Sequence, residues 1–107
     1  MSRFDEVLSR LAAVIEARRG ADPGESWSAR LLADPMLASK KLAEEAVETA
    51  LAAATGDRDA VASESADLVY HWLIVLAQSG VSLDQVAGVL EAREGRSGVA
   101  EKAARQR

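Results

Sequence analysis

The chain contains no cysteine, one histidine and two prolines, and aromatic side chains make up only 4% of its 107 residues. The absence of cysteine excludes disulfides and thiolate metal sites, and it is compatible with a reducing cytosol. With so few aromatic residues, the core must be built mainly from Ala, Leu and Val, which suits close packing of helices. Any metal site in this chain must therefore depend mostly on oxygen ligands.

Positive charge and long hydrophobic runs are also scarce. The 13 Lys and Arg residues are outnumbered by 17 Asp and Glu residues, which gives a net charge of −4 and a pI near 5.0. General nucleic-acid binding needs a basic face, so the composition argues against it. The longest apolar stretch, 68–77, is interrupted by His71 and is too short to span a bilayer, and Asp5 and Glu6 lie where a signal peptide would carry its apolar core. We therefore expect a cytoplasmic protein with no membrane or nucleic-acid partner.

The patterning of the remaining residues is helical throughout. Apolar residues recur at three- and four-residue steps, and Gly, Pro, Ser and Asp mark the breaks between segments. The pattern predicts one all-α domain over 1–107, a small bundle of about five helices. The first predicted helix has its apolar face over 4–15 and ends before Gly20, and a short second helix, capped by Ser26 or Ser28, runs to Ala33. The later helices are predicted over 37–55, from 57 or 59 to 79, and over 83–93, followed by a loose or weakly helical polar tail at 96–107. So small a core makes oligomerisation a reasonable expectation.

Two acidic clusters are the most informative feature of the sequence. Glu44, Glu45 and Glu48 form an E-E-x-x-E run, and Glu64 and Asp67 form an E-x-x-D run. Carboxylates three residues apart lie on nearly the same face of a helix, so each run can direct two ligands to one point. The fifteen residues between Glu48 and Glu64 suffice for a turn and an antiparallel helix, which would bring the two clusters together. Hard oxygen ligands of this kind select Mg²⁺ or Mn²⁺.

The surroundings of the two clusters differ. In the first helix, apolar residues cover one side and the three glutamates lie on the other, which by itself fits a solvated face equally well. In the second helix, Glu64, Asp67 and His71 fall within a sector of roughly 60° on an otherwise apolar segment. A carboxylate stripe on a largely buried helix needs a partner, because unpaired buried charge is costly. The acidic first cluster cannot be that partner, whereas a metal ion can.

These motifs resemble the MazG-type, all-α nucleotide pyrophosphohydrolases and, among them, the phosphoribosyl-ATP pyrophosphatase family of histidine biosynthesis. The likeness extends along most of the chain, from the entry segment SWSARL through KLAEEAVE and ESADLVYH to the stretch that begins REG. The corresponding residues are 26–31, 41–48, 64–71 and 93–103. One position departs from the family pattern, since Ala43 stands where Gly usually precedes the Glu pair, and the segment between Leu32 and Lys40 is also altered.

The resemblance implies Mg²⁺-dependent hydrolysis of phosphoribosyl-ATP to phosphoribosyl-AMP and pyrophosphate by a homodimer. It implies that the metal ligands are Glu45, Glu48, Glu64 and Asp67. Glu44 and Glu45 are the expected catalytic residues. Glu44 would orient the attacking water, act as general base, or only face solvent. The expected phosphate-binding residues are Arg30, Lys40 and Lys41, of which the family motif favours Lys41. His71 is either a core residue or a catalyst, and Trp27 and Trp72 either pack in the core or stack on adenine.

Other functions remain open at this level. A house-cleaning nucleoside triphosphate pyrophosphatase would keep the same carboxylates and act on another nucleotide. A non-catalytic helical interaction module would show no Mg²⁺ dependence and would leave the acidic stripe unexplained. A di-iron bundle is excluded because it needs E-x-x-H motifs, whereas Leu51 and Asp67 follow Glu48 and Glu64 at the third position.

Overall fold

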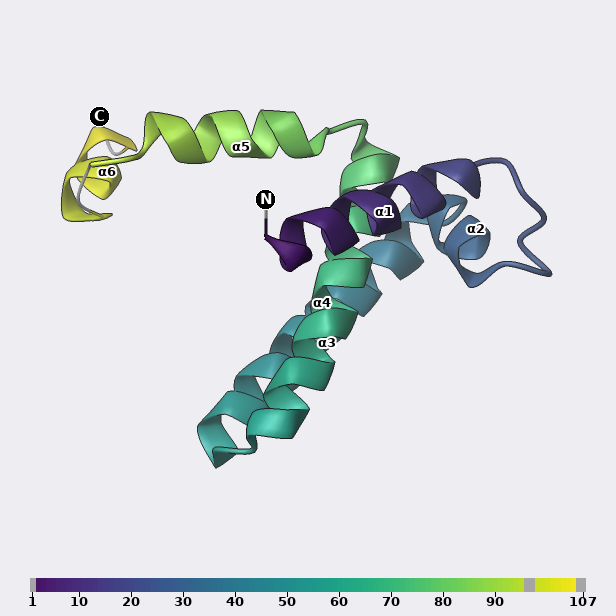
Figure 1. The fold of residues 1–107 in the computed structure, drawn as a ribbon, viewed down its shortest axis with the longest axis horizontal. Coiled ribbons are helices and arrows are strands. Elements are labelled where there is room, and N and C mark those ends of the chain that lie inside the picture. Colours follow the sequence, from purple (N-terminus) through teal and green to yellow (C-terminus); the bar gives the residue numbers. More distant parts are fainter. Residues whose placement is uncertain (1, 96–97, 106–107) are drawn as a thin grey trace.

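The fold is a set of helices arranged around one long antiparallel pair (Figure 1). The computed structural model describes residues 2–95 and 98–105, and over these residues it contains no strand. The helices are α1 (Arg3–Ala17), α2 (Trp27–Leu32), α3 (Pro35–Thr55), α4 (Arg58–Ser79), α5 (Leu83–Ala92) and α6 (Gly98–Arg105). The predicted all-α class is confirmed. Helix α6 occupies part of the segment predicted as a polar tail, while residues 96, 97, 106 and 107 of that tail lie outside the described residues.

Helices α3 and α4 form the hairpin on which the rest of the fold is built. Pro35 occupies the first turn of α3 and Asp34 caps that helix by accepting a hydrogen bond from the Leu37 amide. Proline is favoured at this position because the first amides of a helix have no intrahelical acceptor. The helix therefore begins two residues before the predicted start at Leu37. At the other end, Gly56 adopts φ +75° and Asp57 caps α4, so the two helices are joined by two residues only.

The core lies where α1 and α2 pack against one end of this hairpin. Its buried residues are Ile15, Leu31, Ala38, Leu73 and Ile74, which come from all four helices. Gln78 of α4 donates hydrogen bonds to the carbonyl groups of Leu31 (3.0 Å) and Leu32 (3.2 Å) at the end of α2. The Leu31 carbonyl also accepts from the Asp34 amide at 3.1 Å, and together the two bonds from Gln78 fix the end of α2 against α4.

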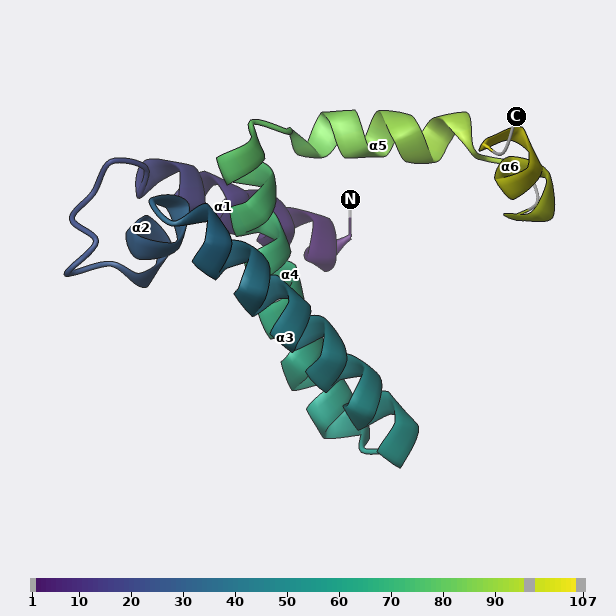
Figure 2. The same ribbon diagram turned by 180° about the vertical axis from the view of Figure 1, so that it is seen from behind.

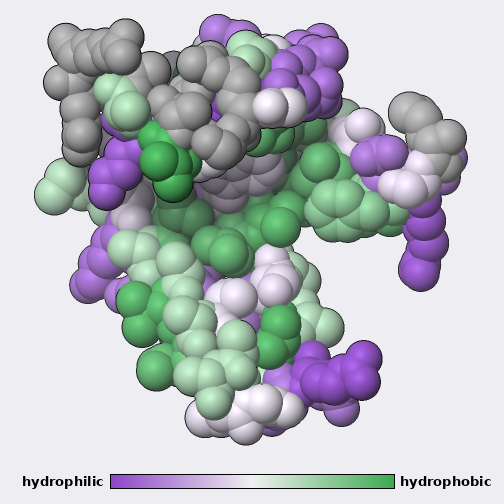
Figure 3. All heavy atoms as spheres, turned by 90° about the vertical axis from the view of Figure 1, so that its left-hand side faces the viewer, coloured by the Kyte–Doolittle hydropathy of each residue, from purple (hydrophilic) through white to green (hydrophobic). Residues whose placement is uncertain are grey.

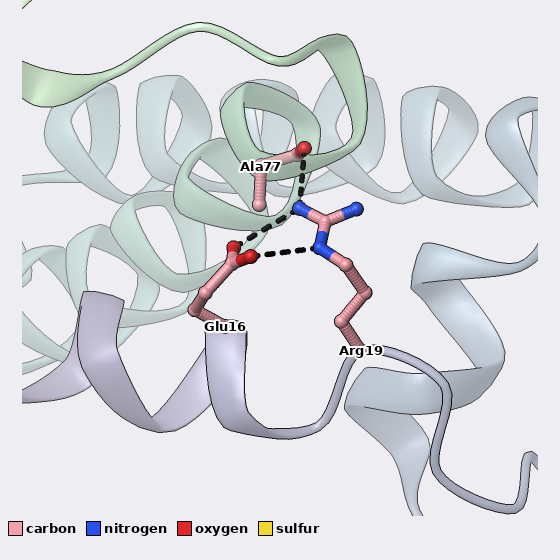
Figure 4. Close-up of polar contacts among 3 residues, drawn as sticks. All are labelled: Glu16, Arg19 and Ala77. Atoms are coloured by element: carbon pink, nitrogen blue, oxygen red, sulfur yellow. Dashed lines mark hydrogen bonds and ion pairs between the residues drawn. The ribbon is translucent and has the colours of Figure 1, made fainter.

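A second polar contact fixes the end of α1. The Arg19 guanidinium donates to both carboxylate oxygens of Glu16, at 2.8 and 3.0 Å, and to the carbonyl oxygen of Ala77 at 2.8 Å (Figure 4). Ala77 lies in the last turn of α4, where the helix dipole is negative, and its carbonyl oxygen also accepts a hydrogen bond from the Gly80 amide at 3.3 Å. One side chain thus joins the C-terminal ends of α1 and α4.

Helix α5 projects away from the other helices (Figures 1 and 2). Ser82 and Gln85 form a capping box at its start, and Leu83 packs against the core. Further along, Val89 and Leu90 are 50% and 61% exposed. An amphipathic helix therefore leaves its apolar side uncovered in the single chain.

The apolar side of α3 is also exposed. Val47 and Leu51 are 58% and 61% exposed, whereas Glu45 is buried between Ala38 and Ala52 at seven-residue spacing. Helix α3 thus turns a glutamate towards α4 and leaves larger apolar residues outside. A solvated acidic face, which the pattern had left open for this helix, does not describe Glu45.

Among the described residues, helix α4 is the one helix that is long and apolar enough to cross a membrane by length and composition alone. Its 22 residues include a window of 18 with a mean hydropathy of 1.2. The central helix of a water-soluble domain meets the same test. The sequence pattern predicted that α4 is buried on several sides. In the structure only three of its residues are buried (His71, Leu73 and Ile74), so α4 is more exposed than predicted.

Candidate functional site

The hairpin brings three of the predicted metal ligands together. Glu45 and Glu48 on α3 and Glu64 on α4 each offer a carboxylate oxygen within 4.8 Å of the others. The short connection at Gly56 makes this possible, since it aligns the second half of α3 with the first half of α4. Glu45 is buried, Glu64 is half-buried and Glu48 is exposed, so the group opens to solvent on one side.

The other two predicted acidic residues lie at the edge of this group. Asp67 is exposed and is not among the three converging carboxylates, although its negative charge acts on both Glu45 and Glu64. Glu44 forms an ion pair with Lys41, with 3.1 Å between Oε2 and Nζ. Its carboxylate therefore has a cationic partner on its own helix, which the sequence analysis did not anticipate.

The converging carboxylates disfavour each other's charge. Burial, followed by the charge and hydrogen bonding of Glu48, raises the pKa of Glu45 above its ordinary value of 4.5. The pKa of Glu64 rises to about 7, first because a hydrogen bond with Glu48 requires a proton, then because of burial and the charges of Glu48, Glu45 and Asp67. A group of acids held in this way is stabilised either by protons or by a cation.

Two buried carboxylate oxygens favour a cation over protons as the group that stabilises this cluster. Oε2 of Glu45 and Oε2 of Glu64 are buried and have no hydrogen-bond partner among the described residues. Ionised carboxylates only accept hydrogen bonds, so these atoms cannot satisfy one another. Buried oxygens without donors, contributed by two helices, fit a hard divalent cation with oxygen ligands. The donor set therefore suits Mg²⁺ or Mn²⁺.

The predicted phosphate-binding residues lie in different surroundings. Lys40 lines an open hollow of about 420 Å³ together with Ala43, Glu44, Val47 and Glu48. Lys41 pairs with Glu44, and this pairing raises the pKa of its ammonium group. The hollow adjoins the carboxylates through Glu48, so Lys40 lies beside the three converging acids.

Arg30 does not lie in this hollow. Its guanidinium lies 5.7 Å from the ring centre of Trp27, as in a cation–π contact. Trp27 is 44% exposed, while Trp72 packs against the core. The structure thus gives the two tryptophans different environments, and it places Arg30 beside the exposed one.

His71 contributes an atom that sequence reasoning did not single out. Its Nδ1 lies 2.8 Å from the carbonyl oxygen of Asp67, which can only accept, so Nδ1 carries the proton. Nε2 is then a lone-pair acceptor, and it is buried without a partner among the described residues. The neighbouring Tyr70 packs edge-on against the imidazole at 5.0 Å, and its hydroxyl hydrogen-bonds to Ser28 on α2. The position of His71 on the carboxylate stripe was the available sequence signal.

Comparison with known proteins assigns this arrangement to a family. The model for the phosphoribosyl-ATP pyrophosphohydrolase family matches residues 8–94, which include both acidic clusters and all of α1–α5 except the first residues of α1. A protein of Caulobacter vibrioides named phosphoribosyl-ATP pyrophosphatase is 65% identical over 103 residues, covering 96% of each chain.

Two further relatives carry the same name. The protein of Caulobacter sp. is 65% identical over 105 residues, which is 98% of each chain. That of Cereibacter sphaeroides is 56% identical over 100 residues, covering 92% of this chain and 97% of the relative. Both the family match and these identities extend over nearly the whole chain. The chain belongs to the phosphoribosyl-ATP pyrophosphohydrolase family.

Proposed function

We propose that this protein hydrolyses phosphoribosyl-ATP to phosphoribosyl-AMP and pyrophosphate, the second step of histidine biosynthesis. The observation that carries the proposal is the convergence of Glu45, Glu48 and Glu64, with two buried oxygens that lack donors. Family membership supplies the substrate class.

We propose that Glu45, Glu48, Glu64 and Asp67 hold Mg²⁺, with Mn²⁺ as a substitute. When bound, the ion supplies charge neutralisation for the phosphates and lowers the pKa of a water molecule. Asp67 lies one helical step beyond Glu64, and its charge already acts on the cluster.

The other polar residues bind and orient the reactants. Lys40 and Lys41 contact phosphate oxygens, and Arg30 contacts a more distant anionic group of the substrate. Glu44 orients the attacking water or accepts its proton, with Glu45 as the alternative acceptor. The ion pair with Lys41 holds the Glu44 carboxylate in one orientation, and a general base must be oriented towards its proton.

The chain acts, in this proposal, as a cytoplasmic homodimer with a small-molecule nucleotide substrate. Support for the dimer comes from Val47 and Leu51 on α3 and from Val89 and Leu90 on α5, all of which are at least half exposed. Exposed apolar residues gathered on one side of a helix are typical of a protein–protein contact. The net charge of −4 supports the absence of a nucleic-acid partner.

The test is pyrophosphate release from phosphoribosyl-ATP, measured with Mg²⁺ and with EDTA, alongside ATP and other nucleoside triphosphates. We expect Mg²⁺-dependent release from phosphoribosyl-ATP alone. Release mainly from another nucleotide would assign the chain to house-cleaning hydrolysis with the same carboxylates. Absence of release from every substrate would favour a non-catalytic interaction module and would direct attention to Ala43.

A further inference from the structure

Helix α5 has an apolar side and no surface to cover it within the chain. Leu83, Val86, Val89 and Leu90 fall within a sector of about 120°. Leu83 reaches the core, but Val89 and Leu90 remain largely exposed. The helix has only ten residues, and isolated helices shorter than about 12–15 residues are marginal in water. Its stability therefore depends on a packing partner.

An apolar groove lies between α1 and α4. It has a volume of about 260 Å³ and is lined by Phe4, Val7 and Leu11 of α1 and by Ala62 and Val69 of α4, among others. Phe4 and Val7 are 60% and 40% exposed, so the groove is open to solvent. Seen from the side towards which α5 projects, hydrophobic surface gathers in the middle of the molecule between hydrophilic groups (Figure 3).

The chain holds its own α5 away from this groove. Gly80 turns the backbone at φ +71°, and the Val81 amide donates to the Leu76 carbonyl at 3.0 Å. Val81 and Leu83 then lie against residues of α1 and α4. These contacts fix the direction in which α5 leaves α4, and that direction carries the helix away from the body (Figures 1 and 2). Folding back would require the turn and the Leu83 contact to be given up.

The two surfaces are complementary in charge. On the groove side, Arg3 and Arg10 lie four and three residues from Val7, and so flank it on the same face of α1. Helix α5 contains Asp84 and Glu91 and no basic residue. A basic rim beside the groove therefore matches an acidic helix with an apolar side.

We infer that α5 of one copy lies in the α1–α4 groove of a second copy, and that the second copy's α5 occupies the groove of the first. A reciprocal contact of this kind is what a two-fold dimer requires, because each copy supplies both surfaces. The inference rests on the homodimer proposed above and adds to it the surfaces that meet.

The absence of cysteine from the chain makes disulfide trapping a clean test. In the double variant Val7→Cys/Leu90→Cys, mild oxidation should give a species of twice the chain mass on a non-reducing gel. The matched control is Val7→Cys/Glu91→Cys, which moves the second thiol about 100° around the same helix and should not form this species. Sedimentation should show that Leu90→Asp loses the dimer and that Met36→Asp, changed at an apolar residue that is 83% exposed and lies outside the groove, keeps it.

The possible outcomes distinguish a failure of the α5 exchange from a failure of the proposed homodimer. A monomeric wild-type protein would remove the homodimer and the exchange together. A dimeric wild-type protein whose double variant links only within one chain, or not at all, would overturn the exchange and leave the dimer in place. A Leu90→Asp variant that keeps the dimer would also overturn it.

Discussion

Glu45 is buried on α3, and the residues seven positions before and after it, Ala38 and Ala52, are buried alanines. The neutral replacement Glu45→Gln keeps the shape and removes the charge. We expect turnover to fall by at least about 100-fold, as for loss of a metal-site group. Without metal, the melting temperature should stay equal or rise, because repulsion from Glu48 and Asp67 is relieved. Steady-state kinetics and melting in EDTA measure both effects, with the exposed Glu6→Gln as a control that changes neither.

Asp67 tests how far the site extends beyond the three converging carboxylates. Asp67→Asn should nearly abolish turnover while the far-UV circular dichroism stays that of the parent. Its comparison partner is Glu64→Gln, altered within the 4.8 Å group. A fully active Asp67→Asn variant beside an inactive Glu64→Gln variant would restrict the ligands to the three glutamates.

The raised pKa of Glu64 predicts a pH dependence in the metal-free protein. Its value is about 7 in the folded state against 4.5 ordinarily, so folding favours the protonated form. That contribution to stability is complete below pH 4.5 and is lost as the pH rises through 7. Thermal melts in EDTA should therefore show a lower melting temperature at pH 8 than at pH 5.5, with a smaller difference in Glu64→Gln. Equal slopes in the two proteins would contradict the assignment to Glu64.

At the scale of the elements, the hairpin turn can be tested through its glycine. Gly56 has φ +75° and an added Cβ would meet no atom within 4 Å, so only backbone strain opposes a side chain there. Gly56→Ala should cost about 1–2 kcal/mol of unfolding free energy. Gly88→Ala makes the same chemical change inside α5, where space is also open, and should stabilise that helix by about 0.5–1 kcal/mol. Denaturant titrations compare the two, and a shift of the same sign in both would contradict the backbone argument.

Local sequence signals identified most of these elements. Asp57, Ser26 and Ser82 cap the predicted helices, and Gly56 and Gly80 end two of them, because capping and left-handed turns depend on neighbouring residues. The orientation of α3 could not be predicted from its own pattern. Its apolar residues Val47 and Leu51 are exposed because α4 packs against the side of α3 that carries Glu45. Which side a neighbouring helix covers depends on tertiary packing and not on the pattern of α3 alone.

The candidate site could likewise be predicted only in part. Residue spacing within each acidic run predicted which carboxylates share a helix face, and the number of residues between the runs predicted that the two runs come together. Spacing said nothing of the ion pair between Lys41 and Glu44, nor of the unpartnered Nε2 of His71. Both depend on side-chain rotamers and on which atoms of a neighbouring helix are close.

At the scale of the whole molecule, metal binding should stabilise the fold. An ion that binds only the folded state adds about 2.7 kcal/mol when its concentration is 100 times the dissociation constant. Millimolar Mg²⁺ should therefore raise the melting temperature, and Glu45→Gln should abolish the shift. Calorimetric scans with Mg²⁺ and with EDTA give the answer, and an unchanged melting temperature in the presence of a substrate analogue would count against the proposed ligands.

The two-residue connection between α3 and α4 has a kinetic consequence. Helices that follow one another along the chain find each other by closing a short loop, and proteins dominated by such local contacts fold in microseconds to milliseconds. The three converging glutamates all belong to this one hairpin. Their arrangement thus depends on local contacts and requires neither α1 nor a second chain. A newly synthesised chain would therefore be able to form the proposed ion site before it meets any other copy.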